Sequence, residues 1–441
     1  MWSKKNASTL TDNSSTLWSA EPDLKTRRLY LLALVLLLGM TLSVAFHYIL
    51  GRVLHVGHVH TTFLVQTGGR RTELGNTFGD LFAPLKSAKA SVKGGVIWLA
   101  PTPFFHVIYL ALGPLGRIGA LLLQYGVFFA GMIVLLWRTY VDALTSLAQR
   151  ITYLFILLVF SYPVVFVLER GNLEMLVFVV MAGFLYAYYA KNSAWCVVLL
   201  AIAISLKIFP AVFLVLLIAD RRYRWTLYTV LYSGLLTFGS VVLLALRHGF
   251  GLLGQAHMSI NALREINRLC VTEFRGLPYG HSLWGLLVSF AGFLGLDQRA
   301  FVAHAASVYT IVVGVAFAAL AVFVIRIVKL PWQRVALLTL AGLVLPTVSA
   351  DYRLLYIYLP LAMLLNAPVR TRVDMACVAL FGCLLVPMDY FYRGLLRVSG
   401  WAWPGDHTST SVVVYPLVMI VLLAAIIWNA YGERDRPIPP L

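Results

Sequence analysis

Long apolar runs alternate with short polar segments along most of the chain. A helix that crosses the hydrocarbon core of a bilayer needs about 20 mostly apolar residues, and several runs are shorter. We therefore expect an all-α polytopic membrane protein with about 11 to 13 transmembrane helices. The runs lie near residues 29–50, 96–115, 118–137, 151–168, 173–190, 194–206, 208–219, 226–246, 282–296, 303–328, 335–348, 354–367, 373–388 and 411–430.

The composition supports a membrane protein. Of the 441 residues, 60% are hydrophobic and 12% are charged, whereas a soluble domain carries about 25% charged residues. A soluble enzyme, a disordered protein and a disulfide scaffold are excluded. No small-residue cleavage site follows the first run, so we expect a retained helix and not a removed signal peptide. The cysteines have no CxxC spacing and predict neither a disulfide framework nor a thiolate metal site.

Charge adds a prediction of topology. The chain has 35 Lys and Arg against 18 Asp and Glu, a formal net charge of +17. Most bases lie in short loops beside apolar runs, where they act as topology signals and contact anionic lipid, so no nucleic-acid partner is expected. We place the disordered 1–28 tail in the cytoplasm, with the loops at 220–224, 326–334 and 370–372. Residues 29–430 form a single transmembrane domain, and 431–441 a second cytoplasmic tail.

The opposite, extracytoplasmic face then receives the other polar segments. Counting the runs forward places 170–172 in the cytoplasm, whereas counting backward from 220–224 places it outside. The backward count starts from the stronger basic loop, so we expect 170–172 outside and one run between 96 and 190 broken or re-entrant. The remaining outer segments are 51–95, 207–210, 247–281, 349–353 and 389–410.

The first outer loop contains an aspartate, Asp80, at the start of a short amphipathic segment. Apolar residues recur there at helical spacing, with lysines on the other faces, which predicts a helix lying in the membrane interface. Asp80 is either the cap of this helix or a carboxylate held at the membrane surface as a general base. The apolar positions are Leu81, Leu85, Ala88 and Val92, and the lysines are Lys86, Lys89 and Lys93.

Lys207 stands between two apolar runs, three residues before Pro210. A proline inside such a stretch breaks the helix and leaves backbone groups free next to one fixed positive charge. Two interpretations stay open. The ammonium group is a ligand for a phosphate, or the side chain extends to the lipid headgroups.

Two further polar segments interrupt the apolar runs. In Glu169-Arg170-Gly171-Asn172-Leu173-Glu174, the glycine permits a tight turn and the asparagine can cap the next helix; pairing of the charges within the segment is the structural alternative. In Ser349–Arg353, an interfacial aromatic belt explains the neighbouring tyrosines but not Asp351 and Arg353.

No metal or nucleotide motif stands out. The nearest approach to a metal site is His55-x-x-His58-x-His60, which reads as an extended segment without a second carboxylate. We therefore expect no bound metal. Phosphate-loop, dinucleotide-binding and GxSxG patterns are absent, so nucleotide-driven transport and serine hydrolysis receive no support.

In their order along residues 29–370, these features resemble the GT-C superfamily of integral-membrane glycosyltransferases, most of all glycosyltransferase family 87. Members of that family use polyprenol-phosphate-mannose donors. The most specific piece is Leu206-Lys207-Ile208-Phe209-Pro210 running into the basic loop Arg221–Trp225. The other pieces are Gly79-Asp80-Leu81-Phe82, Ala100–Phe105, Pro163 with Arg170-Gly171-Asn172, His281-Ser282-Leu283-Trp284 and Ser349–Arg353. The chain departs from the family pattern at Arg170-Gly171, at His281 and at Asp351-Tyr352.

The resemblance implies an inverting transfer of a sugar from a polyprenyl-phosphate donor to a lipid or glycan acceptor, with mannose as the expected sugar. It places a GT-C-like active site on the outer face of the plasma membrane, with no cofactor and no metal. Asp80 is then the general base, and Lys207, with Arg353 or His281, neutralises the departing phosphate. Arg170, Asn172 and Asp351 complete the expected substrate-binding set, and the partners are the donor, the acceptor and membrane lipids.

Two rival functions remain. A transporter or flippase of a polyprenyl-linked or sugar-linked lipid also needs buried cations for a phosphate headgroup, but it needs access from both faces. A polymerase or ligase of lipid-linked glycans concentrates arginines and a histidine in a large late outer loop, and 247–281 has some of that character.

Overall fold

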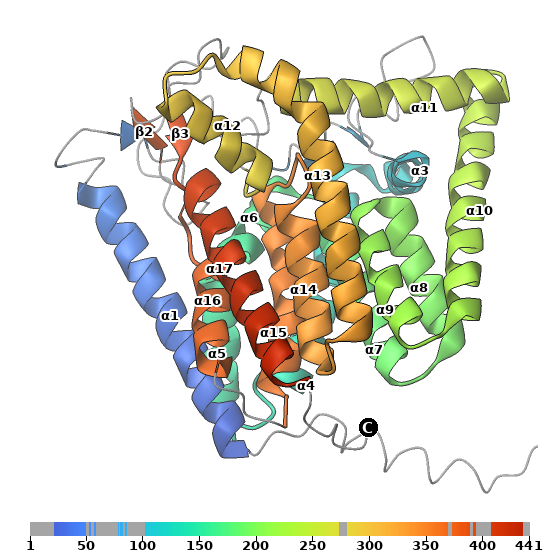
Figure 1. The fold of residues 1–441 in the computed structure, drawn as a ribbon. Coiled ribbons are helices and arrows are strands. Elements are labelled where there is room, and N and C mark those ends of the chain that lie inside the picture. The colour runs from blue at the N-terminus through green and yellow to red at the C-terminus, as the bar shows by residue number, and fades with distance from the viewer. Residues whose placement is uncertain are drawn as a thin grey trace, which may run out of the picture.

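The computed structural model describes residues 22–49, 53, 57–58, 78, 80–82, 84–85, 102–272, 280–368, 373–388, 391–393 and 407–434. They form a bundle of helices (Figure 1). The first half contains α1 (Pro22–Tyr48), α3 (Pro103–Leu112), η5 (Gly113–Leu115), α4 (Gly116–Thr139), α5 (Leu147–Val159), α6 (Tyr162–Arg170), α7 (Glu174–Tyr189), α8 (Ser193–Leu206), η6 (Phe209–Phe213) and α9 (Leu214–Ala219).

The second half contains α10 (Tyr223–His248), α11 (Leu252–Asn267), η7 (Arg268–Thr272), α12 (Leu283–Phe293), α13 (Gln298–Arg326), α14 (Pro331–Val344), η9 (Asp351–Ile357), α15 (Tyr358–Leu365), α16 (Asp374–Leu385) and α17 (Ser411–Gly432). The all-helical prediction omitted one small element. Three short strands, β1 (Gly57–His58), β2 (Phe391–Arg393) and β3 (His407–Ser409), form an antiparallel sheet that joins the segment after α1 to the segment between α16 and α17.

The chain is a multi-pass membrane protein. Among the described residues, five helices are long and apolar enough to cross a bilayer, or six if the bent pair α5 and α6 counts as one span. These five are Pro22–Phe46, Pro103–Thr139, Tyr223–His248, Gln298–Arg326 and Ser411–Gly432. They confirm a polytopic helical protein, and the larger expected number of about 11 to 13 transmembrane helices stays a prediction. The other apolar runs form shorter helices of 10–17 residues, such as α7, α8 and α12.

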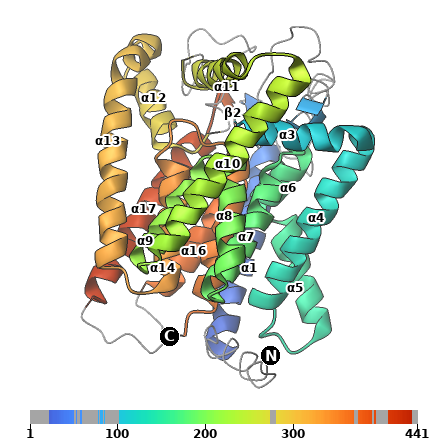
Figure 2. The same cartoon turned by 90° about the vertical axis from the view of Figure 1, so that its right-hand side faces the viewer.

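The bundle has two distinct ends. α1 begins and α17 ends at the lower end in Figures 1 and 2, which we call the terminal end. The basic loops after α9 and α13 lie at this end too, whereas the bases of 370–372 lie outside the described residues. α3, α11, α12 and the strands lie at the opposite end, which we call the site end. The grouping of the basic loops at one end agrees with the predicted topology.

The expected break between residues 96 and 190 is present. α5 and α6 meet at an angle of 60°, at the Phe160-Ser161 junction, where Pro163 in the first turn of α6 has no N–H to continue the α5 ladder. α3 lies across the site end and turns through η5 into α4 (Figure 2). The segment 170–172 therefore lies at the same end as Lys207, as the backward count predicted.

The N-terminal boundary requires a correction. Residues 22–28 were assigned to a disordered tail, but α1 already begins at Pro22. Lys25 and Arg28 are buried against the rest of the bundle. Their partners, described below, come from distant segments, so the apolar run alone did not reveal where this helix starts.

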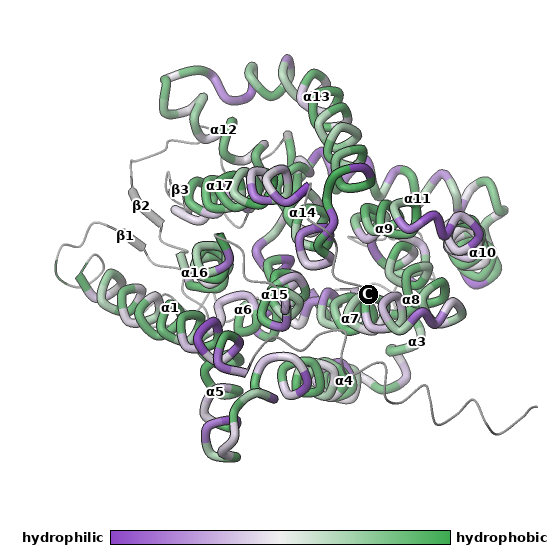
Figure 3. Tube along the Cα trace, turned by 60° about the horizontal axis from the view of Figure 1, so that its bottom comes forward, coloured by the Kyte–Doolittle hydropathy of each residue, from purple (hydrophilic) through white to green (hydrophobic). Residues whose placement is uncertain are grey.

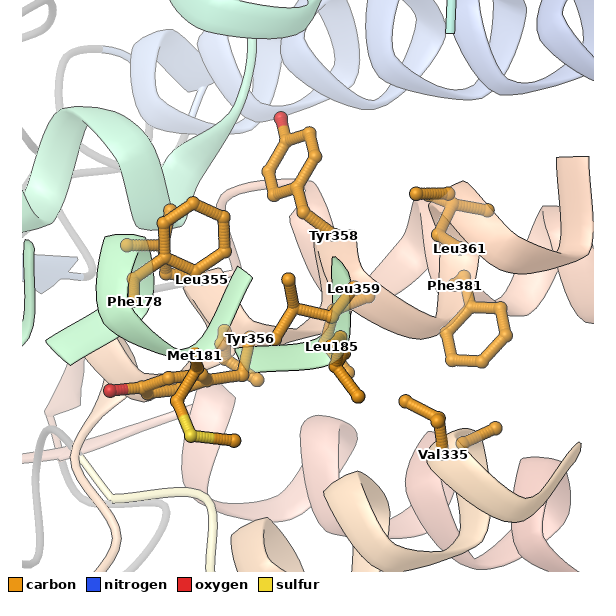
Figure 4. Packing of buried hydrophobic residues seen from close by; sticks show 14 of the residues in the cluster. Phe178, Met181, Leu185, Val335, Leu355, Tyr356, Tyr358, Leu359, Leu361 and Phe381 are labelled. Carbon is orange, nitrogen blue, oxygen red and sulfur yellow. The ribbon is translucent and has the colours of Figure 1, made fainter. Parts of the chain in front are cut away.

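The main core fills the middle of the bundle. Figure 4 shows Phe178, Met181 and Leu185 of α7 packed near Leu355, Tyr356 and Leu359 of η9 and α15, with α14 and α16 also contributing. A second, smaller core lies around Trp284 under α12 and α13. Many apolar side chains face outward instead, for example Leu235 of α10 and Ile311 of α13, and Figure 3 shows apolar residues along these outer helices. Such faces suit contact with lipid.

Candidate functional site

Charged residues from distant segments converge at the site end. Asp80 comes from the segment between α1 and α3, Arg170 and Glu174 flank the α6–α7 junction, Lys207 follows α8, and Arg353 lies in η9. We call these five residues the charged cluster. Three cations face two carboxylates, which leaves one positive charge in excess.

Asp80 is held by side chains of the α6–α7 junction. The Arg170 guanidinium donates to both carboxylate oxygens, with N–O distances of 2.6 and 3.3 Å, and the Asn172 amide donates to Oδ2 at 2.8 Å. The side chains of Asp80 and Arg170 are 23% and 32% exposed. The carboxylate is thus fixed in orientation and still reachable from outside.

The backbone brings this loop close to the junction. The N–H of Phe78 donates to the carbonyl of Glu169 at 2.8 Å, and the Tyr109 hydroxyl of α3 donates to the carbonyl of Asp80 at 2.8 Å. Gly171 has a positive φ of 62°, and a Cβ there would lie 3.2 Å from Cβ of Leu81. Glycine is therefore required twice at this position, by the left-handed turn and by the close approach.

Glu174 lies at the centre of the charged cluster. Its side chain is fully buried, and Oε1 lies 3.4 Å from Nζ of Lys207 and 3.5 Å from Nε of Arg353. The Tyr356 hydroxyl donates to Oε2 at 2.5 Å, and the Glu174 N–H donates to Oδ1 of Asn172 at 2.9 Å. Arg170 and Glu174 thus each have a charged partner outside their own segment.

Lys207 points into the protein and not towards lipid headgroups. Its side chain is only 9% exposed, and its ammonium lies 5.2 Å from the ring centre of Phe105 and 5.8 Å from that of Tyr352. α8 ends at Leu206 because Lys207 is extended, and the Thr102 hydroxyl donates to the freed carbonyl of Ser205 at 2.6 Å. The predicted helix break is confirmed, and the ammonium is directed towards Glu174.

His281 and Asp351 form a separate, fully buried pair beneath Arg353. Nδ1 of His281 lies 3.1 Å from Oδ1 of Asp351, Oγ of Ser349 lies 2.8 Å from Nε2, and the Tyr162 hydroxyl donates to Oδ2 of Asp351 at 2.8 Å. Burial lowers the pKa of His281 and raises the pKa of Asp351, so both groups shift towards their neutral forms.

This pair joins two distant loops. The His281 N–H donates to the carbonyl of Ser349 at 3.0 Å, and Gly280 and Ala350 form an isolated antiparallel bridge. The sequence analysis predicted both residues as substrate ligands. Because both are enclosed by protein, their geometry suits the positioning of Arg353, two residues after Asp351, better than direct contact with a substrate.

One hydrogen bond connects an apolar groove to the end of α8, directly before Lys207. A cavity of about 540 Å³ lies between α10 and α11. Ser233 at its wall accepts, through its carbonyl, a hydrogen bond of 3.3 Å from the hydroxyl of Ser205, two residues before Lys207. The lining residues are Ser233, Gly234, Thr237, Phe238, Val241, Leu252, Leu253 and Ala256.

The sequence interpretation omitted some members of the site. Glu174 was visible as an ionisable residue at the start of an apolar run, but was assigned to pairing with its neighbours. Tyr356 was attributed to an aromatic belt. The helix proposed after Asp80 is described only in part, since Lys86, Lys89 and Lys93 lie outside the described residues.

The histidine segment of the first loop also lies largely outside the described residues, because His55 and His60 are not among them. Within the described part of the chain, no group of three His, Cys, Asp or Glu side chains is arranged to hold a metal ion.

Comparison with known proteins adds no assignment. No protein-family model, no curated protein and no solved structure matches the chain.

Proposed function

We propose that the protein is a glycosyltransferase that moves a sugar from a polyprenyl-phosphate donor to a lipid or glycan acceptor. Mannose is the expected sugar. The observation that carries the proposal is the juxtaposition of a reachable, oriented carboxylate, Asp80, with the excess positive charge around Lys207 and Arg353. An acceptor hydroxyl needs the first, and a departing phosphate needs the second. In this proposal the site end faces the outside of the plasma membrane.

The reaction is a single displacement. Asp80 takes the proton of the acceptor hydroxyl, whose oxygen forms a bond to the anomeric carbon. The bond between that carbon and the phosphate oxygen breaks, and its electron pair leaves with the lipid phosphate. One displacement inverts the anomeric configuration. Arg170 and Asn172 keep the Asp80 carboxylate aimed at the acceptor, and Lys207 and Arg353 stabilise the charge that develops on the phosphate oxygen.

The apolar groove supports a lipid-linked donor. Its wall is hydrogen-bonded to the end of α8, directly before Lys207. In this proposal the long isoprenoid chain of a donor whose phosphate is bound at Lys207 extends to the groove, where burying each apolar carbon contributes to affinity.

The charge distribution favours this enzyme over a transporter. A transporter alternates its access between the two faces of the membrane. Here the partly exposed charged cluster lies at the site end, whereas Arg28 and Asp374 at the terminal end are fully buried in contact with each other. Transport nevertheless remains a distinct outcome of the experiment below.

The test is transfer by purified protein in lipid, from radiolabelled polyprenyl-phosphate sugars to a lipid extract. Wild type is compared with Asp80→Asn and with the control Asp23→Asn, which removes an exposed carboxylate at the terminal end. We expect product from wild type and from the control, and a loss of about 10²–10⁴-fold in Asp80→Asn.

Two other results would contradict the proposal. Transfer that survives in Asp80→Asn would return Asp80 to a structural role at the start of its helix. Donor that crosses the bilayer unchanged, equally in all three proteins, would make the protein a transporter of sugar-linked lipid.

A further inference from the structure

Glu174 lies farther from its two cations than Asp80 lies from Arg170. A charge-assisted hydrogen bond has an N–O distance of about 2.7–2.9 Å, and Arg170 reaches Asp80 at 2.6 Å. Glu174 instead stands 3.4 and 3.5 Å from two cations, and its Oε1 and the Nε of Arg353 have no hydrogen-bond partner among the described residues. The two cations thus keep donors available for another anion.

Glu174 is nevertheless firmly placed. Its Oε2 accepts the Tyr356 hydroxyl at 2.5 Å, and its backbone is capped by Asn172. The carboxylate therefore cannot follow an incoming phosphate or move out of its way. It remains a fixed negative charge next to whatever anion Lys207 and Arg353 bind.

We infer that Glu174 sets the charge selectivity of the phosphate site, so that the site binds a singly charged phosphodiester in preference to a doubly charged phosphomonoester. Lys207 and Arg353 with Glu174 leave one net positive charge, while Asp80 and Arg170 neutralise each other. A single negative charge on the ligand balances this site. A second one is repelled by Glu174 without a cation left to compensate.

This inference rests on the proposed function and extends it. A sugar linked to a lipid through one phosphate is a phosphodiester with one negative charge. The lipid phosphate left after transfer is a monoester, whose second ionisation has a pKa of about 6, so it is doubly charged at neutral pH. Glu174 would therefore weaken the binding of the product relative to the donor and so speed its release.

The test measures binding and needs no catalysis. Purified protein in nanodiscs is titrated at about pH 8 with two probes, decyl phosphate as the monoester and methyl decyl phosphate as the diester. Wild type should prefer the diester. Glu174→Gln should raise the affinity for the monoester relative to the diester by about tenfold, and Glu174→Asp, which keeps the charge, should retain the wild-type preference.

A titration at about pH 5 provides an internal control, because the monoester then carries one charge. There the difference between the two probes should disappear in wild type. Arg353→Gln gives a second measurement in case Glu174→Gln fails to fold. It removes one positive charge and should strengthen the preference for the diester, while lowering the affinity for both probes.

An equal change of both affinities in Glu174→Gln would overturn the inference, as would a failure of both probes to bind any variant. These results are independent of the transfer assay. If the binding selectivity is found without sugar transfer, the inference about charge holds and the proposed reaction fails.

Discussion

The two ends of the bundle both contain buried charges, but they use them differently. At the terminal end, Arg28 contacts Asp374 and also donates to the carbonyls of Leu364 and Ala367 at 2.8 and 2.9 Å. Lys25 contacts Asp142 and donates to Asn366 at 2.5 Å. These contacts join α1 to the chain around α15 and α16, so both cations are held at short distances by groups of the protein itself.

At the site end, Glu174 is shared between Lys207 and Arg353 at longer distances, and Asp80 remains partly exposed. Removing one partner of a buried, closely contacting ion pair is strongly destabilising, so the pairs at the terminal end are expected to hold the fold together. The longer distances at the site end agree with the ligand-binding role proposed for its cations.

The largest effect is expected from breaking the structural pair. Asp374→Ala leaves Arg28 buried without its carboxylate, and removing one partner of a buried ion pair costs about 3–5 kcal/mol of unfolding free energy. Arg27→Ala is the matched control, because Arg27 and Asp23 form an exposed i,i+4 pair worth about 0.5 kcal/mol or less. Denaturant unfolding in detergent measures both, and equal losses would contradict the structural role of Arg28.

Gly171→Ala tests the close approach of the Asp80 segment to the α6–α7 junction at the site end. A left-handed φ costs a non-glycine residue about 1–2 kcal/mol, and the new Cβ would also press on Leu81 next to Asp80. Gly249→Ala has the same backbone penalty, with φ 70° and no atom within 4 Å of the new Cβ. Both variants should lose stability, and only Gly171→Ala should also lose sugar transfer. Equal transfer by both would show that the approach of the Asp80 loop to α6 is not needed.

Filling the apolar groove should affect lipid binding without unfolding the protein. A Cβ at Gly234 meets no atom within 4 Å, so Gly234→Trp is expected to fold and to occupy part of the cavity. The affinity for a long-chain polyprenyl phosphate should fall by about tenfold, because several apolar carbons lose their contact surface. Gly239→Trp, also on α10 with open space around it and not among the groove residues, should leave the affinity unchanged.

The smallest effect concerns the break after α8. Thr102→Val removes the hydroxyl that donates to the carbonyl of Ser205 and that accepts the Phe105 N–H at the start of α3, which should lower the unfolding free energy by about 1–2 kcal/mol. Thr41→Val serves as the control, since exposed Thr41 donates only to Leu37 of its own helix. A thermal unfolding series on both variants measures the difference, and no difference would mean that the helix end is stabilised without Thr102.

The sequence predicted which residues gather in the candidate site, but not how all of them are paired or enclosed. The sequence analysis selected polar residues that interrupt apolar runs, because placing such groups in a membrane is energetically costly. The structure brings five of them together: Asp80, Arg170, Asn172, Lys207 and Arg353. The sharing of Glu174 was not predicted, because local pairing with Arg170 was equally compatible with the spacing. His281 and Asp351 were selected correctly as unusual residues, but their enclosure inside the protein was not visible in the pattern.

The amino-acid sequence was sufficient to predict a multi-pass helical membrane protein with its basic loops at one end. It also predicted the helix break at Lys207 and a second break between residues 96 and 190. Hydrophobic runs, charge placement and prolines act locally, so they can be read from neighbouring positions. Three features were visible only in the folded structure: α3 lies across the site end, α1 begins at Pro22, and Glu174 lies between Lys207 and Arg353. Each of these depends on a counter-charge or a packing surface supplied by a segment far away in the chain, which local periodicity does not specify.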